Sequence, residues 1–138
     1  MDSNPGSIHI LLAEDDSDDI LFFKEALNGL SIAAILVTAE DGEKLMKVLS
    51  KFDSPPPPDV IFLDINMPKK NGKECLEEIR SKKIFDNVPV IMFSTSTSIS
   101  DINEAFEKGA TSTFQSHFSF QIRKIFLRNY SLRNGGNT

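Results

Sequence analysis

The chain has 138 residues, with 15 Lys and Arg against 20 Asp and Glu and a formal net charge of −5. This length fits one domain, and an acidic balance without a run of Lys or Arg excludes an electrostatic nucleic-acid footprint. The apolar runs are too short to cross a bilayer, residues 1–7 carry no secretory signal, and the single cysteine excludes an internal disulfide framework. We therefore expect a cytoplasmic protein with neither a membrane nor a nucleic-acid partner.

Segments typical of strands and helices alternate along residues 7–130, which we expect to form one domain between flexible tails at residues 1–6 and 131–138. Apolar runs predict strands at residues 8–13, 32–37, 60–63, 90–93 and 112–115. Apolar residues three and four positions apart predict helices at residues 17–30, 42–52, 72–81, 100–108 and 119–130. Ser100 is the expected N-cap of the fourth helix. The alternation predicts an α/β protein with right-handed crossovers and an open parallel sheet.

Three acidic residues, Glu14, Asp15 and Asp16, follow directly after the first predicted strand. One interpretation is that they only cap the next helix, because Asp is common at helix N-termini. Capping is the preferred interpretation for Asp18 and Asp19, which fall in the first turn of that helix. The other interpretation places the three acids at the carboxyl edge of a parallel sheet, where ligands bind.

The third predicted strand places another carboxylate in the same way. The apolar run after Asp59 delivers Asp64 to its end, and Pro68 then stops the strand. Asp64 is therefore expected to be a metal ligand or a nucleophile, close to Glu14, Asp15 and Asp16. Clustered carboxylates resist ionising together unless a cation lies among them. Ligands that are all oxygen favour a hard cation, Mg²⁺ rather than Zn²⁺.

Two more groups are expected at this edge of the sheet. The strand near residues 90–93 ends in hydroxyl side chains, of which Ser94 is the first, and such a hydroxyl can hydrogen-bond an anion bound beside Asp64. The turn after Asp64 can offer the backbone carbonyl of Asn66 to a metal. Elsewhere, Ser54 and the four prolines that follow it, residues 55–58, predict a stiff connector, and Cys75 is expected to fill space in a helix.

The motifs ILLAEDD, DVIFLDINMPKKNG and VPVIMFSTS, in this order and spacing, resemble those of the response regulator receiver domain of two-component signalling. The resemblance extends over nearly the whole chain, from about Ser7 to Tyr130. It implies a flavodoxin-like (βα)5 fold, in which an open parallel five-stranded sheet has the strand order 2-1-3-4-5 and helices on both faces.

The same resemblance implies a role for each strand-end residue. Asp64 matches the phosphoacceptor, and Ser94 matches the hydroxyl that hydrogen-bonds the phosphoryl group. Asp15 matches the direct Mg²⁺ ligand, Glu14 acts on the metal through water, and the backbone carbonyl of Asn66 completes the metal site together with Asp64.

One family position is different in this chain. After the fifth strand the family has a Lys whose ammonium pairs with the phosphoryl group, whereas this chain has Ser116, followed by His117. No Lys or Arg occurs between Gly109 and Ile122, so a small shift in the alignment does not restore the cation. The phosphorylated form is therefore expected to lose one charge-assisted contact, worth about 1.5 to 3 kcal/mol. The aromatic switch position of the fifth strand is Thr113.

Three functions are consistent with these motifs. The first is a single-domain response regulator, not an enzyme, that accepts a phosphoryl group on Asp64 from a sensor histidine kinase or phosphotransfer protein. It is expected to signal through protein contacts or a phosphorelay, as a monomer or weak dimer. Its output surface is expected within about residues 100–130. The second is a docking module that acts without phosphorylation because Ser116 replaces the Lys. The third, a Mg²⁺-dependent phosphohydrolase, is disfavoured because Asn66 stands where such enzymes have a second acid.

Overall fold

The computed structural model describes residues 7–29, 33–52, 57–65, 67, 69–94 and 99–115, with the backbone alone described at residues 94, 99–102 and 112–115. The predicted helix at residues 119–130, both expected tails, most of the proline-rich connector, Asn66 and Ser116 lie outside the described residues.

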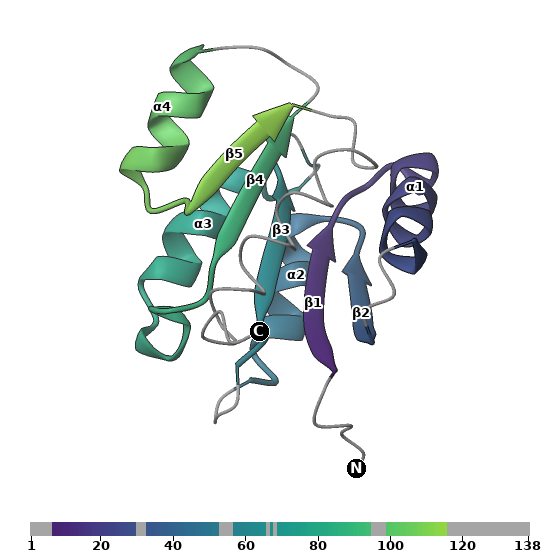
Figure 1. Ribbon diagram of the computed structural model, residues 1–138. Helices are drawn as coiled ribbons and strands as arrows, with labels where there is room; N and C mark the ends of the chain where they lie inside the picture. The colour runs from purple at the N-terminus through teal and green to yellow at the C-terminus, as the bar shows by residue number, and fades with distance from the viewer. Residues whose placement is uncertain are drawn as a thin grey trace, which may run out of the picture.

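Strands and helices alternate along the chain as predicted (Figure 1). The strands are β1 (Ile8–Ala13), β2 (Ala34–Ala39), β3 (Val60–Asp64), β4 (Val90–Ser94) and β5 (Ser112–Gln115). The described helices are α1 (Ser17–Asn28), α2 (Gly42–Leu49), α3 (Gly72–Arg80), the short 3-10 helix η1 (Lys83–Phe85) and α4 (Ile99–Glu107). None of them is both long and apolar enough to span a membrane.

The sheet has the predicted order β2-β1-β3-β4-β5, and each neighbouring pair is parallel. All five arrows in Figure 1 point the same way, so the carboxyl ends of the strands share one edge of the sheet. The fold is therefore the flavodoxin-like arrangement that the sequence predicts.

The central strands contribute alternate residues to two separate cores. Leu11 in β1 and Ile61 in β3 pack in the core that also contains residues of α2, α3 and α4. Leu12 and Phe62, one position further along the same strands, pack in the core that contains residues of α1. Helices therefore cover both faces of the sheet (Figure 1). Burial on both faces explains why these strands are unbroken apolar runs instead of alternating patterns.

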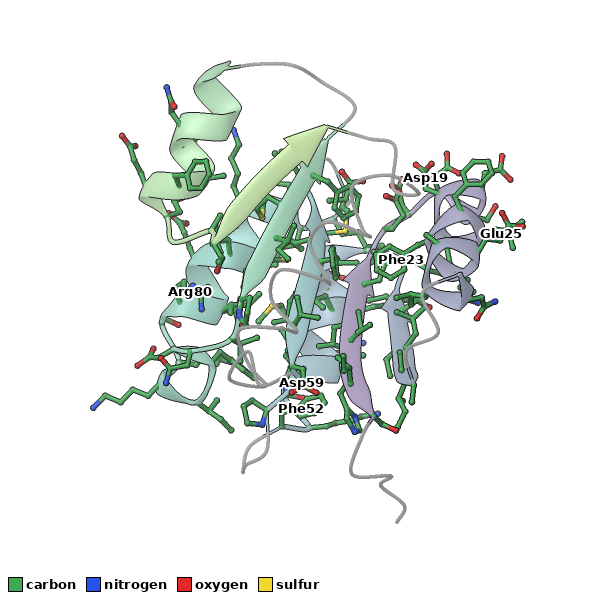
Figure 2. All side chains as sticks on the ribbon, viewed as in Figure 1. Asp19, Phe23, Glu25, Phe52, Asp59 and Arg80 are labelled. Atoms are coloured by element: carbon green, nitrogen blue, oxygen red, sulfur yellow. The ribbon has the colours of Figure 1, made fainter. Side chains whose placement is uncertain are left out.

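Two contacts fix β1, β3 and α1 relative to one another. The Phe23 ring of α1 meets the Phe62 ring of β3 edge to face, with ring centroids 4.9 Å apart, and Figure 2 shows Phe23 directed at the sheet. At the amino end of the sheet, the backbone N–H of His9 donates to Oδ2 of Asp59 at 2.8 Å, and the Asp59 N–H donates to the His9 carbonyl at 2.9 Å. These contacts link α1 and the amino end of β1 to β3.

Some predicted boundaries are wrong. The strand predicted at residues 32–37 is β2, Ala34–Ala39, because its pairing with β1 (Ile8 with Ala34, Ala13 with Ala39) decides its extent. The helix α4 begins at Ile99, so Ser100 lies inside the helix and is not its N-cap. The 3-10 helix Lys83–Phe85 has no counterpart in the prediction, because three residues are too few to show a helical period.

Candidate functional site

The first two acidic positions after β1 lie beside the end of β3. Ala13 pairs with Leu63 in the register of these strands, which places Glu14 and Asp64 at the same level. Glu14, Asp15 and Asp64 each offer a carboxylate oxygen, and these oxygens lie within 4.8 Å of one another. The structure therefore brings together three of the residues that the sequence singles out.

Burial gives the three carboxylates different environments. The exposed fractions of Glu14 and Asp64 are 3% and 8%, whereas Asp15 is exposed. Burial, with a smaller contribution from the charges of Asp64, Asp19 and Asp15, raises the pKa of Glu14 to about 8, in spite of a lowering effect of the Asp16 backbone N–H. That N–H donates to Oε2 of Glu14 at 3.0 Å. Ionised Glu14 is therefore unfavourable unless positive charge is nearby.

Asp16 does not belong to this cluster, and the expectation that it converges with the other acids is wrong. Its Oδ1 accepts hydrogen bonds from the backbone N–H groups of Asp18 at 2.8 Å and Asp19 at 3.3 Å, which makes Asp16 the N-cap of α1. Asp18 and Asp19 lie in the first turn of that helix, as predicted, where negative charge is favourable.

The two ends of the segment that joins β3 to α3 lie against each other beside Asp64. The Ile65 N–H donates to the Phe93 carbonyl of β4 at 2.9 Å, and the Gly72 N–H donates to the Ile65 carbonyl at 3.0 Å. A Cβ atom at Gly72 would lie 2.2 Å from the Asp64 carbonyl oxygen, so the start of α3 packs directly on the Asp64 backbone. Sequence reasoning missed Gly72, although a glycine at a helix start can signal such an approach.

The remaining predicted site residues are placed only in part. Asp64 pairs with Phe93, so Ser94, the next residue, follows at the carboxyl end of β4 and pairs with Gln115 of β5. The side chain of Ser94 is not described, and Asn66 lies outside the described residues. The predicted roles of both residues stay predictions.

The donor set fits a hard divalent cation. Three carboxylate oxygens lie within reach of one ion, and the group contains neither Cys nor His. A cation among them would favour the ionised form of Glu14 over the protonated one. Cys75 is fully buried, its burial raises the thiol pKa to about 11, and it fills the core as predicted.

The family model for the response regulator receiver domain matches residues 10–121. The chain belongs to this family. Among curated proteins, the receiver domain is 34% identical over 109 residues to the response regulator Rcp1 of Synechocystis sp., covering 77% of this chain and 74% of Rcp1. The match to this chain covers only 46% of the length of LytT from Oceanobacillus iheyensis. It covers 51% of the length of the probable C4-dicarboxylate response regulator DctR from Bacillus subtilis.

Solved structures of response regulators superpose on this receiver domain. The phosphorylated cyanobacterial phytochrome response regulator RcpA has a TM-score of 0.83 at 31% identity, over 91% of this chain and 96% of RcpA. The Mn²⁺-bound form of Rcp1 has a TM-score of 0.73 at 27% identity, over 90% of this chain and 91% of that one. RPA3017, which acts in red light signalling in R. palustris, has a TM-score of 0.74 at 28% identity, over 86% and 91%.

Proposed function

We propose that the chain is a cytoplasmic response regulator whose Asp64 accepts a phosphoryl group from a phosphohistidine on a sensor histidine kinase or phosphotransfer protein. Glu14, Asp15, Asp64 and the backbone carbonyl of Asn66 hold the Mg²⁺ ion that this transfer requires. The observation that carries the proposal is the convergence of the Glu14, Asp15 and Asp64 carboxylates within 4.8 Å at the carboxyl edge of the sheet.

The comparisons support this proposal in two ways. One similar structure is of a phosphorylated response regulator, and another contains bound Mn²⁺, a hard divalent cation that oxygen ligands also bind. Both cover at least 90% of this chain with a TM-score of 0.73 or more. We extend the phosphorylation and the binding of a divalent metal from these proteins to this chain.

In the proposed transfer, a carboxylate oxygen of Asp64 attacks the phosphorus of the donor. An oxygen–phosphorus bond forms as the phosphorus–nitrogen bond breaks, and the bond's electron pair stays on the departing imidazole nitrogen. Mg²⁺, when bound, neutralises charge on the carboxylates and the phosphoryl oxygens. The enclosing loop from Ile65 to Gly72 fixes the backbone that carries Asp64, and Ser94 donates a hydrogen bond to a phosphoryl oxygen of the product.

The product is an acyl phosphate on Asp64. Its role is to signal, and the protein does not use it to turn over a substrate. Phosphorylation converts a carboxylate of charge −1 into an acyl phosphate of about −1.5 to −2. It therefore adds up to about −1 of charge, and three acceptor oxygens, beside the ends of β3 and β4. Loss of the phosphoryl group requires attack by water and releases inorganic phosphate, which we expect to be slow. The readout is contact with a downstream protein or relay of the phosphoryl group, through the surface within residues 100–130.

A second function rests on Ser116. Since no Lys or Arg follows β5 before Ile122, the phosphorylated state lacks the cation that the family uses, and a docking module that works without phosphorylation is the alternative. The variant Ser116→Lys separates the two functions. It should raise the yield or lifetime of the acyl phosphate in a phosphoacceptor, and it should leave a phosphorylation-independent docking module unchanged.

The decisive experiment is intact-mass analysis after incubation with acetyl phosphate and Mg²⁺. We expect a gain of about 80 Da, one phosphoryl group, that is absent with EDTA and absent in Asp64→Asn. Asp59→Asn, at the opposite edge of the sheet, is the matched control and should still be phosphorylated. The proposal would be contradicted if the protein binds Mg²⁺ but gains no mass from acetyl phosphate or from a panel of histidine kinases.

A further inference from the structure

The corner between β2 and α2 is joined to the loop that follows Asp64. Asp41 is buried and is the N-cap of α2, where its Oδ1 accepts a hydrogen bond from the Lys44 backbone N–H at 2.8 Å. Its other oxygen, Oδ2, lies 3.7 Å from Nζ of Lys69 in the loop between β3 and α3. One carboxylate therefore fixes the start of a helix and also attracts the loop.

The next residue, Gly42, brings the two backbones into contact. A Cβ atom at Gly42 would lie 2.0 Å from the Lys70 carbonyl oxygen and 2.6 Å from the Lys70 Cβ, so only glycine permits this approach. The Gly42 carbonyl also accepts a hydrogen bond from Sγ of Cys75 at 3.7 Å. The corner thus packs on the loop and on α3 together.

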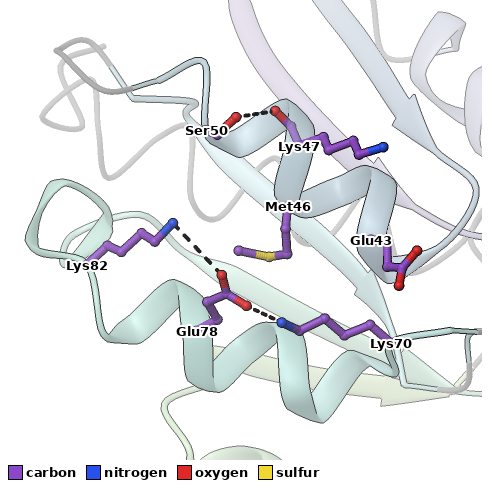
Figure 3. A pocket seen from close by; sticks show the side chains of 7 residues that line it. All are labelled: Glu43, Met46, Lys47, Ser50, Lys70, Glu78 and Lys82. Carbon is purple, nitrogen blue, oxygen red and sulfur yellow. Dashed lines mark hydrogen bonds and ion pairs between the residues drawn. The ribbon is translucent and has the colours of Figure 1, made fainter.

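Lys69, in this loop, has a backbone conformation that neighbouring residues must stabilise. Lys69 has φ of 69°, in the left-handed region that residues with side chains rarely occupy. Such a residue persists where neighbouring structure determines it, and the Lys69 side chain pairs with Asp41. The Lys70 side chain extends the other way, to an ion pair with Glu78 of α3, and Glu78 also lies 4.0 Å from Lys82 (Figure 3).

A shallow hollow of about 460 Å³ separates α2 from α3 on this side, with Met46 and Lys47 on one wall and Glu78 and Lys82 on the other (Figure 3). Side chains therefore do not fill the space between the outer parts of the two helices. The loop is held by contacts at its base, namely the backbone contact at Gly42 and the Lys70–Glu78 pair.

We propose that Asp41 and Gly42 are positioning residues for the site: they hold the loop that follows Asp64 and thereby set metal affinity and the rate of phosphoryl acceptance. This inference rests on the proposed function. The loop starts at Asp64, contains Asn66, and ends at Gly72, which packs on the Asp64 carbonyl. Lys70 lies two residues before Gly72, so a displacement of Lys70 acts on the start of α3 that packs on the Asp64 backbone.

The first test compares two Gly→Ala variants. Gly42→Ala must displace the Lys70 carbonyl, whereas Gly29→Ala, at the C-cap of α1, has its nearest contact at 3.6 Å and an ordinary helical φ of −73°. We expect Gly42→Ala to weaken Mg²⁺ binding, measured by calorimetry, by about ten-fold or more, as for groups that support metal ligands. Gly29→Ala should bind Mg²⁺ as the unmodified chain does.

The second test uses variants that keep the fold. Asp41→Asn retains an N-cap side chain but removes the charge that attracts Lys69, and Lys69→Gln removes its partner. Each should lower Mg²⁺ affinity and the acetyl phosphate rate by about two- to five-fold, and the double variant should be no worse than either single one. Lys44→Gln, which breaks the exposed pair with Glu40, is the matched control and should change neither quantity.

Hydrogen exchange of the metal-free protein provides a readout that is independent of activity. The Gly72 N–H, bonded to the Ile65 carbonyl, should exchange faster in Asp41→Asn and Lys69→Gln, while the amides of β1 keep their protection. Unchanged loop exchange and unchanged Mg²⁺ affinity in Gly42→Ala, Asp41→Asn and Lys69→Gln would overturn the inference and leave the proposed function intact. If the unmodified chain binds no Mg²⁺, the proposed function itself fails, and loop exchange alone then tests the positioning role.

Discussion

Arg80, the last residue of α3, holds the corner between α4 and β5 by donating from Nε to the Gly109 carbonyl at 2.9 Å (Figure 2). Its Nη1 donates to the Phe85 carbonyl at 2.8 Å, at the end of the 3-10 helix that leads toward β4. Gly109 has φ of 108°, and an added Cβ would meet the Arg80 side chain at 2.8 Å. One guanidinium therefore ties the end of α3 to two connections, the corner between α4 and β5 and the segment between the 3-10 helix and β4.

Replacing Arg80 with Met should destabilise the protein by about 2 to 3 kcal/mol, because two carbonyl groups lose charged hydrogen-bond donors. The free energy of unfolding in urea measures this loss. Lys83→Met, in the exposed part of the 3-10 helix, is the matched control and should change stability by less than about 0.5 kcal/mol. Equal effects of the two substitutions would contradict the role of Arg80.

Glu14→Gln should stabilise the metal-free protein at alkaline pH. Since burial raises the Glu14 pKa from 4.5 to about 8, the folded state binds this proton more tightly than the unfolded state. The free energy of unfolding therefore falls as pH rises from 4.5 toward 8, and the amide removes that loss. Thermal unfolding in EDTA should show a higher Tm for Glu14→Gln above pH 8 and no advantage below pH 4.5. The corresponding gain in the free energy of unfolding above pH 8 should be roughly 1 to 3 kcal/mol.

The control for this experiment is Glu25→Gln, which removes an exposed carboxylate from α1. It should leave the pH dependence of Tm unchanged. A Glu14→Gln variant that is less stable than the unmodified chain at every pH would mean that the ionised carboxylate is favourable in the folded protein.

Magnesium should raise the Tm of the unmodified protein, and EDTA should reverse the change. A concentration ten times the dissociation constant stabilises by about 1.4 kcal/mol if the ion binds only the folded state. The gain should be larger near pH 8 than near pH 4.5, because binding must release the proton that Glu14 holds at lower pH. Asp15→Asn removes one of the clustered carboxylates and should abolish most of the gain, whereas Asp86→Asn, an exposed residue after the 3-10 helix, should not.

Glu104 joins α4 to α3 and should contribute a small, salt-dependent stability. Its Oε1 lies 2.8 Å from Nζ of Lys73 and its Oε2 lies 3.9 Å from Nζ of Lys108, which also pairs with Glu77. Partly exposed pairs contribute little, so Glu104→Gln should cost about 1 kcal/mol or less, and the cost should shrink at about 1 M salt. Glu107→Gln, in the exposed last position of the same helix, should have no measurable effect on urea unfolding.

The placement of Glu14 and Asp64 could be predicted from the sequence because it follows from general rules of parallel sheets. Both residues end apolar runs, and the resemblance made their strands neighbours, which the sheet order confirms. The exclusion of Asp16 from the cluster could not be predicted, because a carboxylate at that position can cap a helix or face the sheet. The backbone direction after Glu14 decides between the two, and no residue pattern encodes that direction.

The contact between Gly42 and Lys70 was also inaccessible to sequence reasoning. A glycine after Asp41 is typical of an ordinary helix start. Nothing in the neighbouring sequence indicates that another loop packs so closely that a Cβ atom cannot be present there. The end of β2 could not be predicted for the same reason. Thr38 and Ala39 belong to the strand because β1 continues to Ala13 beside them. Periodicity predicts which segments are strands and helices, whereas their ends and close approaches depend on partners distant in sequence.

The burial of Cys75 leaves the native chain effectively without a thiol that modifying reagents can reach, since this cysteine is fully buried and its pKa is raised to about 11. Phe106, on α4, has an exposed fraction of 49%. Phe106→Cys would therefore accept a maleimide dye at one chosen position without any prior removal of the natural cysteine. The colour or polarisation of that dye could then report, in real time, whether α4 moves when a phosphodonor is added.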